Sequence, residues 1–335
     1  MADFPKTLPK VLGARFTADP ARWLLKARSP LVKYRAAVGL LAWPRDSDEA
    51  AAWWDRRYED PDLAAVAGAQ SADGLWYAPA RFFGRRPSLY VPKYLAAVWQ
   101  LPILADLGLT LEEPTAAAAV AAISAARTAD GFFDLGPGGP FVRGNALAVS
   151  SLTRLGVGGA ELAAAREWLA SRQRPDGGWA DEIEIDAGAP STIATTAEVL
   201  RALGGGDEGA TAGAREGGKA YVRANLFTEY NGRFPRSSRP WRRLGWPQFR
   251  CDALSVASAL AAAGASRREV TPLAAAVRSL QARRGFWRQQ VPAGEPYWLE
   301  PVRAGRASRW VTYRAASFLI WFYGGAGPER DCDVY

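Results

Sequence analysis

The stretch that decides the fold is Trp168-Leu169-Ala170-Ser171-Arg172-Gln173-Arg174-Pro175-Asp176-Gly177-Gly178-Trp179. Leu162 and Ala165, upstream of it, and Trp168 and Leu169, at its start, follow the spacing of one helix face. Proline and two glycines then end the helix in a turn, because proline cannot continue a helix and glycine adopts backbone conformations closed to other residues. The stretch predicts a helix, a tight turn and a buried tryptophan.

The same kind of turn recurs along the chain at intervals of 46 to 57 residues, at Gly74, Gly131, Gly177, Gly232 and Gly285. A second glycine series ends other apolar stretches, at Gly108, Gly156, Gly204, Gly264 and Gly324. Between the glycines the apolar spacing is helical, as in 192–203. A long internal period of this kind is typical of repeat architectures, and each unit here has two helices.

Pairing these helices predicts two layers. The inner layer comprises 33–42, 93–107, 144–155, 192–203, 251–263 and 310–323. The outer layer comprises 46–58, 114–126, 160–173, 211–226 and 268–281, together with an N-terminal helix at about 17–28. Because the apolar last helix needs a cover, we expect the N-terminal helix to pack on 310–323 and close the ring. The prediction is an all-α fold, an α/α toroid of six helix pairs in a single domain over 1–335, with 324–335 as a C-terminal tail.

The stretch ending at Trp179 resembles the QW repeat of squalene-hopene and oxidosqualene cyclases and of protein prenyltransferase β subunits. Gln70 before Asp73-Gly74-Leu75-Trp76 and Gln281 before Gly285-Phe286-Trp287 extend the resemblance along the chain. The order of motifs is most similar to that of short bacterial members of this superfamily, which are known only as prenyltransferase-like or squalene-cyclase-like proteins. The resemblance implies the toroid, a stabilising role for the glutamine and the tryptophan, and a ligand in the central cavity.

The reactions of these families do not carry over with the fold. Hopene-type cyclases protonate an alkene with an Asp-x-Asp-Asp motif, but the matching positions here are Thr192, Ala194 and Thr195. The prenyltransferase zinc needs a histidine and an Asp-x-Cys pair, whereas this chain has Cys251-Asp252 and no histidine. The absence of histidine also excludes a Ser-His-Asp triad and every histidine metal site. We expect no metal and no cofactor.

Composition indicates a globular protein of a reducing compartment. The chain has 335 residues, 49% hydrophobic and 23% charged, with two cysteines. The N-terminus lacks the pattern of a signal peptide and no apolar run is long enough to span a membrane, so we expect a cytoplasmic protein. The net charge of +8 is modest, which argues against nucleic acid and leaves peripheral membrane contact open.

Cations and aromatic residues occur together where the inner helices begin. Helix N-termini already attract anions, so cations there suggest a basic rim for an anionic amphiphile, such as a prenyl diphosphate, with aromatics facing its apolar tail. The candidate ligand-binding residues are Lys33, Tyr34, Arg35, Lys93, Trp99, Arg143, Asn145, Arg250, Arg309, Trp310 and Arg314. The alternative is that these cations are solvated or paired with carboxylates.

Three functions fit this pattern. The first is an isoprenoid-handling enzyme, namely a non-standard terpenoid cyclase or isomerase, or a prenyl-diphosphate-processing enzyme, with Asp252, Glu184 or Asp186 as the acid. The second is a lyase on an acidic polysaccharide, in which arginine neutralises a uronate and Tyr94 or Tyr313 moves the proton. The third is a ligand-binding or assembly protein without catalysis. Asp252 is also placed to cap its helix.

Overall fold

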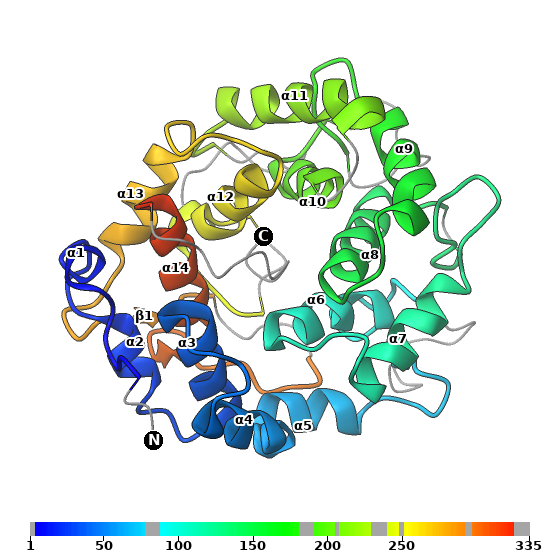
Figure 1. The fold of residues 1–335 in the computed structure, drawn as a ribbon. Helices are drawn as coiled ribbons and strands as arrows, with labels where there is room; N and C mark the ends of the chain where they lie inside the picture. The colour runs from blue at the N-terminus through cyan, green and yellow to red at the C-terminus, as the bar shows by residue number, and fades with distance from the viewer. Residues whose placement is uncertain are drawn as a thin grey trace.

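The computed structural model describes residues 4–77, 88–137, 139–180, 190–204, 208–228, 240–247, 251–291 and 297–324. These residues form two concentric layers of helices around a common centre (Figure 1). The inner layer consists of α3 (Pro30–Leu41), α6 (Ala97–Leu107), α8 (Val142–Arg154), α10 (Ile193–Gly204), α12 (Ala253–Ala262) and α14 (Arg309–Phe322). The expected all-α toroid is confirmed.

The outer layer covers the inner one. It consists of α2 (Pro20–Leu24), α4 (Asp48–Asp55), α5 (Pro61–Gly68), α7 (Pro114–Ser124), α9 (Ala163–Ser171), α11 (Glu208–Ala224) and α13 (Thr271–Ser279). Shorter elements are α1 (Lys10–Gly13) and the 3₁₀ turns η1 (Arg57–Glu59), η3 (Ala160–Leu162) and η4 (Pro240–Arg242). Inner helices that follow one another, such as α8 and α10 or α10 and α12, are in contact, and α14 contacts both α2 and α3.

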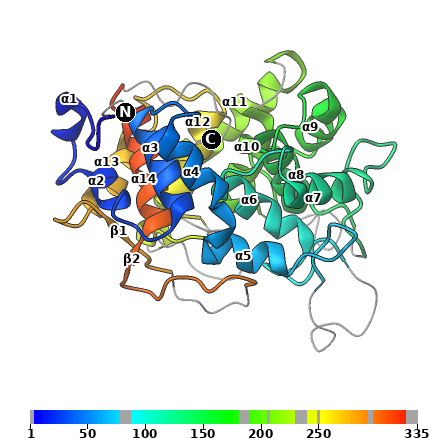
Figure 2. The ribbon, with the colours of Figure 1, turned by 60° about the horizontal axis from the view of Figure 1, so that its bottom comes forward.

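A two-residue antiparallel ladder joins β1 (Trp287–Arg288) to β2 (Ala307–Ser308), with Trp287 opposite Ser308. The sequence showed no alternating pattern there because two residues are too few to produce one. In Figure 2 the ladder lies at the end of the ring where α14 begins. It fixes the approach of the chain to α14, whose first turn is capped by the Ser308 hydroxyl.

Two local features differ from the predicted helices. The inner helix expected at 93–107 begins only at Ala97, because Tyr94 has a left-handed backbone (φ 72°) that a helix cannot include. In the outer layer the structure adds α5 after α4, with Pro61 at its first position and the Asp60 side chain accepting hydrogen bonds from the backbone of Asp62 and Leu63. Pro61 and Asp60 form a helix start that the sequence reading did not use.

In three of the repeats, a glutamine and a tryptophan make the same hydrogen bonds. Gln173 donates to the carbonyls of Gly177, in its own turn, and Ala214, in α11, and the Trp179 indole donates to Leu169. Gln70 and Trp76, and then Gln281 and Trp287, repeat this pattern. Each glutamine therefore joins its own turn to the next outer element.

At Gln281 the next outer element is the beginning of the chain. Its amide nitrogen donates to the carbonyl of Ala18 (2.9 Å), and its amide oxygen accepts from the backbone of Thr17 (2.7 Å). Gly285 allows close approach at the same joint, since a side chain there would collide with the backbone of Ala18 and Asp19. The bond that elsewhere joins successive repeats thus joins the last repeat to the first.

Candidate functional site

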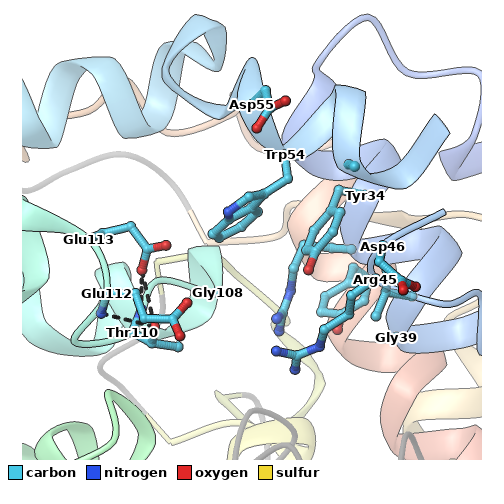
Figure 3. Close-up of a pocket in the computed structure, with 14 residues that line it drawn as sticks. Tyr34, Gly39, Arg45, Asp46, Trp54, Asp55, Gly108, Thr110, Glu112 and Glu113 are labelled. Atoms are coloured by element: carbon cyan, nitrogen blue, oxygen red, sulfur yellow. Dashed lines mark hydrogen bonds between the residues drawn. The ribbon is translucent and has the colours of Figure 1, made fainter. Parts of the chain in front are cut away.

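A pocket of about 290 Å³ opens between α3, α4, the segment after α6, and α14. Figure 3 shows Thr110, Glu112 and Glu113 on one side of it, opposite Tyr34, Trp54 and Arg45. Its lining also includes three residues from the sequence-based list, Tyr34, Arg35 and Tyr313. These come from two inner helices, so the ring closure between α3 and α14 builds one side of the pocket.

Aromatic side chains form the apolar wall. The rings of Tyr34 and Trp54 are 4.7 Å apart, which packs α3 against α4. Tyr313 reaches across from α14 to α3 at Gly39, where any side chain would collide with the tyrosine hydroxyl. Glycine at position 39 therefore lets Tyr313 lie at the pocket wall.

A buried arginine lies behind this wall. The Arg35 guanidinium is 5.0 Å from the centre of the Tyr313 ring, a cation–π distance, and only 7% of the residue is exposed. On its other side is Gly108, where an added side chain would meet the Arg35 guanidinium. Arg35 is thus held between α14 and the end of α6, with its charge largely out of water.

The carboxylates outnumber the cations in this pocket. Arg35 and Arg45 face Asp46, Asp55, Glu112 and Glu113, so the lining has a formal charge of −2. Glu113 is buried and accepts a hydrogen bond from the backbone of Thr110 (2.6 Å), which fixes the loop. The other three carboxylates are exposed. The pocket as a whole is therefore better suited to positive than to negative charge.

A charged cluster joins inner helices close to this pocket. Asp106 of α6 pairs with Arg154 of α8 (2.8 Å), lies 3.9 Å from Arg314 of α14, and accepts from the Trp246 indole (2.9 Å). Burial by itself raises the pKa of Asp106, but Arg314, Arg154 and the hydrogen bonds outweigh it, so the pKa lies below its usual value. Asp106 is an ionised structural carboxylate.

Other predicted ligand residues form a second aromatic group, away from this lining. Lys93 lies over the Tyr90 ring and Arg143 over the Trp99 ring, at 5.9 and 5.7 Å. Tyr94 contacts Trp99, with ring centres 5.1 Å apart. The sequence predicted that these residues would lie at one rim with Arg35. In the structure, Lys93 and Arg143 each lie over a nearby aromatic ring instead.

Asn145 has a structural position. Its amide accepts from the backbone of Phe133 (2.7 Å) and donates to the carbonyls of Phe133 and Phe141. Thr196 and Thr312 bond the backbone of Trp179 and Trp287 from the same point in their helices, the fourth residue. Asn145 thus holds the aromatic turn of its repeat in place.

The remaining predicted residues have separate surroundings. Asp252 caps α12, accepting from the backbone of Ser255. Lys33 lies 5.7 Å from the centre of the Trp53 ring, and the Trp310 indole donates to Asp62 (2.8 Å). Arg309 is exposed at the start of α14. Glu184, Asp186 and Arg250 lie outside the described residues.

Sequence reasoning missed several residues that the structure brings together. Trp54, Arg45 and Glu113 line the pocket from outside the inner helix starts, and Asp106 lies near the end of its helix. Only their position along the chain could have indicated these residues, because the loops that follow the inner helices meet at the same end of a ring. Among the described residues no group of three or more His, Cys, Asp or Glu is arranged to hold a metal ion. No helix in the described ranges is long and apolar enough to cross a membrane.

Neither a family model nor a curated protein matches the chain, but solved structures do. A variant of the type II terpene cyclase MstE from Scytonema, in complex with its substrate geranylgeranyl dihydroxybenzoate, is 14% identical, with 82% of this chain and 75% of that chain covered and a TM-score of 0.50. A protein from Actinoplanes is 16% identical, with 93% and 99% covered and a TM-score of 0.47. The ent-copalyl diphosphate synthase from Streptomyces platensis is 19% identical, with 89% and 58% covered and a TM-score of 0.41. Together with the two helical layers, the first likeness shows that this chain has a fold of the type II terpene cyclase kind.

Proposed function

We propose that the chain is an isoprenoid-handling enzyme of the cyclase or isomerase type, with its active site in the pocket of Tyr34, Trp54 and Tyr313. The observation that carries the proposal is an aromatic wall, surrounded by carboxylates, inside a toroid of the terpene cyclase kind. Aromatic faces and nearby carboxylates stabilise a developing carbocation, which is the charge that isoprenoid cyclisation creates.

The charge of the lining selects among isoprenoids. With a formal charge of −2, the pocket opposes a diphosphate and favours a neutral isoprenoid, such as a short prenyl alcohol. The same argument weakens the lyase hypothesis, because an acidic polysaccharide would also be repelled. The volume of about 290 Å³ is near the lower end for small-molecule pockets and suits a short apolar chain.

Tyr313 is our candidate for the group that accepts the proton when a carbocation is converted to an alkene, because a phenol is too weak an acid to protonate an alkene. Its ring lines the pocket and its hydroxyl lies at Gly39, another lining residue. Asp106 does not suit the role of acid, since its pKa is lowered and it remains ionised. Arg35, beside the Tyr313 ring, would orient the tyrosine and hold the polar end of the ligand.

The test combines binding and turnover with neighbouring tryptophans as matched variants. Trp54 lines the pocket, whereas Trp53 stacks on Trp43 outside it. We expect Trp54→Ala to weaken calorimetric binding of geraniol, a ten-carbon prenyl alcohol, at least tenfold and Trp53→Ala to leave it within twofold. Geranyl diphosphate should bind more weakly than the alcohol. Equal effects of the two variants, or tighter binding of the diphosphate, would contradict the proposal.

Turnover distinguishes an enzyme from a binding protein. Gas chromatography with mass spectrometry should show a cyclised or isomerised product, which has the mass of the substrate and a different retention time. Tyr313→Phe should abolish this product while leaving binding within twofold. A second candidate is a ligand-binding protein without catalysis. It is supported by the Asp106 cluster, because these side chains join α6, α8 and α14 to one another and are already paired. Binding that depends on Trp54 without any product would favour that candidate.

A further inference from the structure

A second pocket, of about 450 Å³, lies at the joint where the ring closes. Its walls are α2, the turn after α13 and the first residue of α14. Four cations line it, Arg22, Lys26, Arg284 and Arg309, against one carboxylate, Asp19, so its formal charge is +3. This sign is opposite to that of the pocket beside Tyr313.

The single carboxylate of this pocket, Asp19, accepts hydrogen bonds from the backbone. Asp19 accepts from the backbone of Leu8 (2.7 Å) through one oxygen and from those of Ala21 (2.8 Å) and Arg22 (3.3 Å) through the other. None of the four cationic side chains forms a hydrogen bond or an ion pair with another residue in the described part of the chain. Arg22, Lys26 and Arg284 are therefore available to a ligand, and Arg309, whose charge also acts on the Asp62 carboxyl, adds to the positive potential.

Comparison among the repeats shows that one of these cations replaces a structural residue. The residue before the turn glycine is aspartate at positions 73, 130 and 176, but arginine at 284. Asp73 and Asp176 accept from the backbone two residues further on, of Leu75 and Gly178, which stabilises the turn. Arg284 gives up that bond and reverses the charge at this joint alone.

Arg309 is a second unusual choice. It is the first residue of α14, where the helix dipole already provides positive potential and a basic side chain is unfavourable. Both cations are held on a rigid joint, because Gln281 bonds the turn to Ala18 and the rings of Trp23 and Phe286 are 5.3 Å apart. The cations are thus gathered around a preformed hollow.

We propose that this pocket binds a phosphate or diphosphate group. Three guanidinium groups suit the bidentate recognition of phosphate oxygens, and Lys26 adds a point charge. The group can belong to a soluble phosphate compound or to a lipid head group, because both present the same oxygens. The site is separate from the aromatic pocket, so it does not depend on isoprenoid chemistry.

The test measures calorimetric binding of inorganic diphosphate to the full chain, and sedimentation with phosphatidylcholine vesicles with and without phosphatidic acid. Arg284→Asp introduces the turn residue that three of the other four repeats have, so this variant should fold. We expect it, combined with Arg309→Gln, to weaken binding more than tenfold. The control, Arg303→Gln with Arg306→Gln, removes two exposed arginines outside the pocket and should change binding less than twofold.

The outcomes separate the two sources. Binding of diphosphate in solution that is lost in the Arg284 and Arg309 variant supports a soluble ligand. Binding only to vesicles with phosphatidic acid, lost in the same variant, supports a lipid head group. No binding to either, or equal loss in the control variant, overturns the proposal. Added salt should weaken binding in both supporting cases, because charge supplies the attraction.

Discussion

Trp179 shows how one side chain holds a repeat together. It is fully buried, its indole donates to the carbonyl of Leu169 in α9, and its backbone N–H donates to the Thr196 hydroxyl. Removing a buried tryptophan leaves a cavity that the surrounding helices fill only in part. The residue therefore stabilises the fold from a position that touches no pocket described above.

We expect Trp179→Ala to lower the free energy of unfolding by about 3–5 kcal/mol. Urea denaturation measures this change, with Val11→Ala, at an exposed position, as the control. A loss below about 1 kcal/mol, close to that of a surface substitution, would show that the turn does not depend on its tryptophan.

The carboxyl group of Asp62, at the start of α5, has a raised pKa. Burial raises its pKa to about 6, helped by the charge of Asp60 and opposed by the hydrogen bond from Trp310 and the charge of Arg309. The folded state therefore binds a proton that the unfolded state releases near pH 4. Stability contributed by this protonated group is present at low pH and is lost as the pH rises from about 4 to 6.

Asp62→Asn should remove this dependence while keeping an oxygen that can accept from Trp310. The shift from 3.8 to about 6 corresponds to about 3 kcal/mol. We expect the variant to gain up to that amount relative to the parent protein between pH 4 and pH 7, measured by urea unfolding at each pH. A stability difference that stays constant across this range would contradict the assignment.

The outer elements are joined by glutamines, and the joints differ in what they connect. Gln173 links α9 to α11, which are also close in sequence, whereas Gln281 links α13 to the segment before α2. Loss of Gln173 therefore weakens a local joint. Loss of Gln281 opens the only described glutamine joint between the two ends of the ring.

We expect Gln173→Ala and Gln281→Ala each to reduce stability by about 1–4 kcal/mol, since each removes two or three hydrogen bonds within a buried joint. Only Gln281→Ala should make residues 4–24 sensitive to limited proteolysis. Equal protection of this segment in both variants would mean that the contact between α2 and α14 suffices to close the ring.

The helices and turns were predictable because each depends on residues near one another in sequence. The glycine series and the apolar spacing placed every inner helix to within a few residues, except at Tyr94, whose left-handed backbone has no sequence signal. The site was less predictable. Arg35, Gly108 and Tyr313 meet through the rotation of three helices about their axes, and Asp106 meets Trp246 across 140 residues.

At the scale of the molecule, total charge conceals two pockets of opposite sign. The chain has a formal charge of +8, yet the lining beside Tyr313 sums to −2 and the lining beside Arg284 to +3. A diffuse basic excess therefore says little about which ligand binds where. The placement of the loops around the ring decides which ligand binds where, with one pocket at the end of α6 and the other at the closure joint.

Closure of the ring also affects the order in which its contacts form during folding. The Gln173 and Gln70 joints span 41 and 45 residues, while the Gln281 joint spans 264. Bringing together ends that are about six times farther apart along the chain costs about 1.6 kcal/mol more in loop entropy. We therefore expect the joint between the two ends of the chain to form last as the protein folds and to open first as it unfolds. The basic pocket, which is lined by residues from both ends, then forms only with that joint.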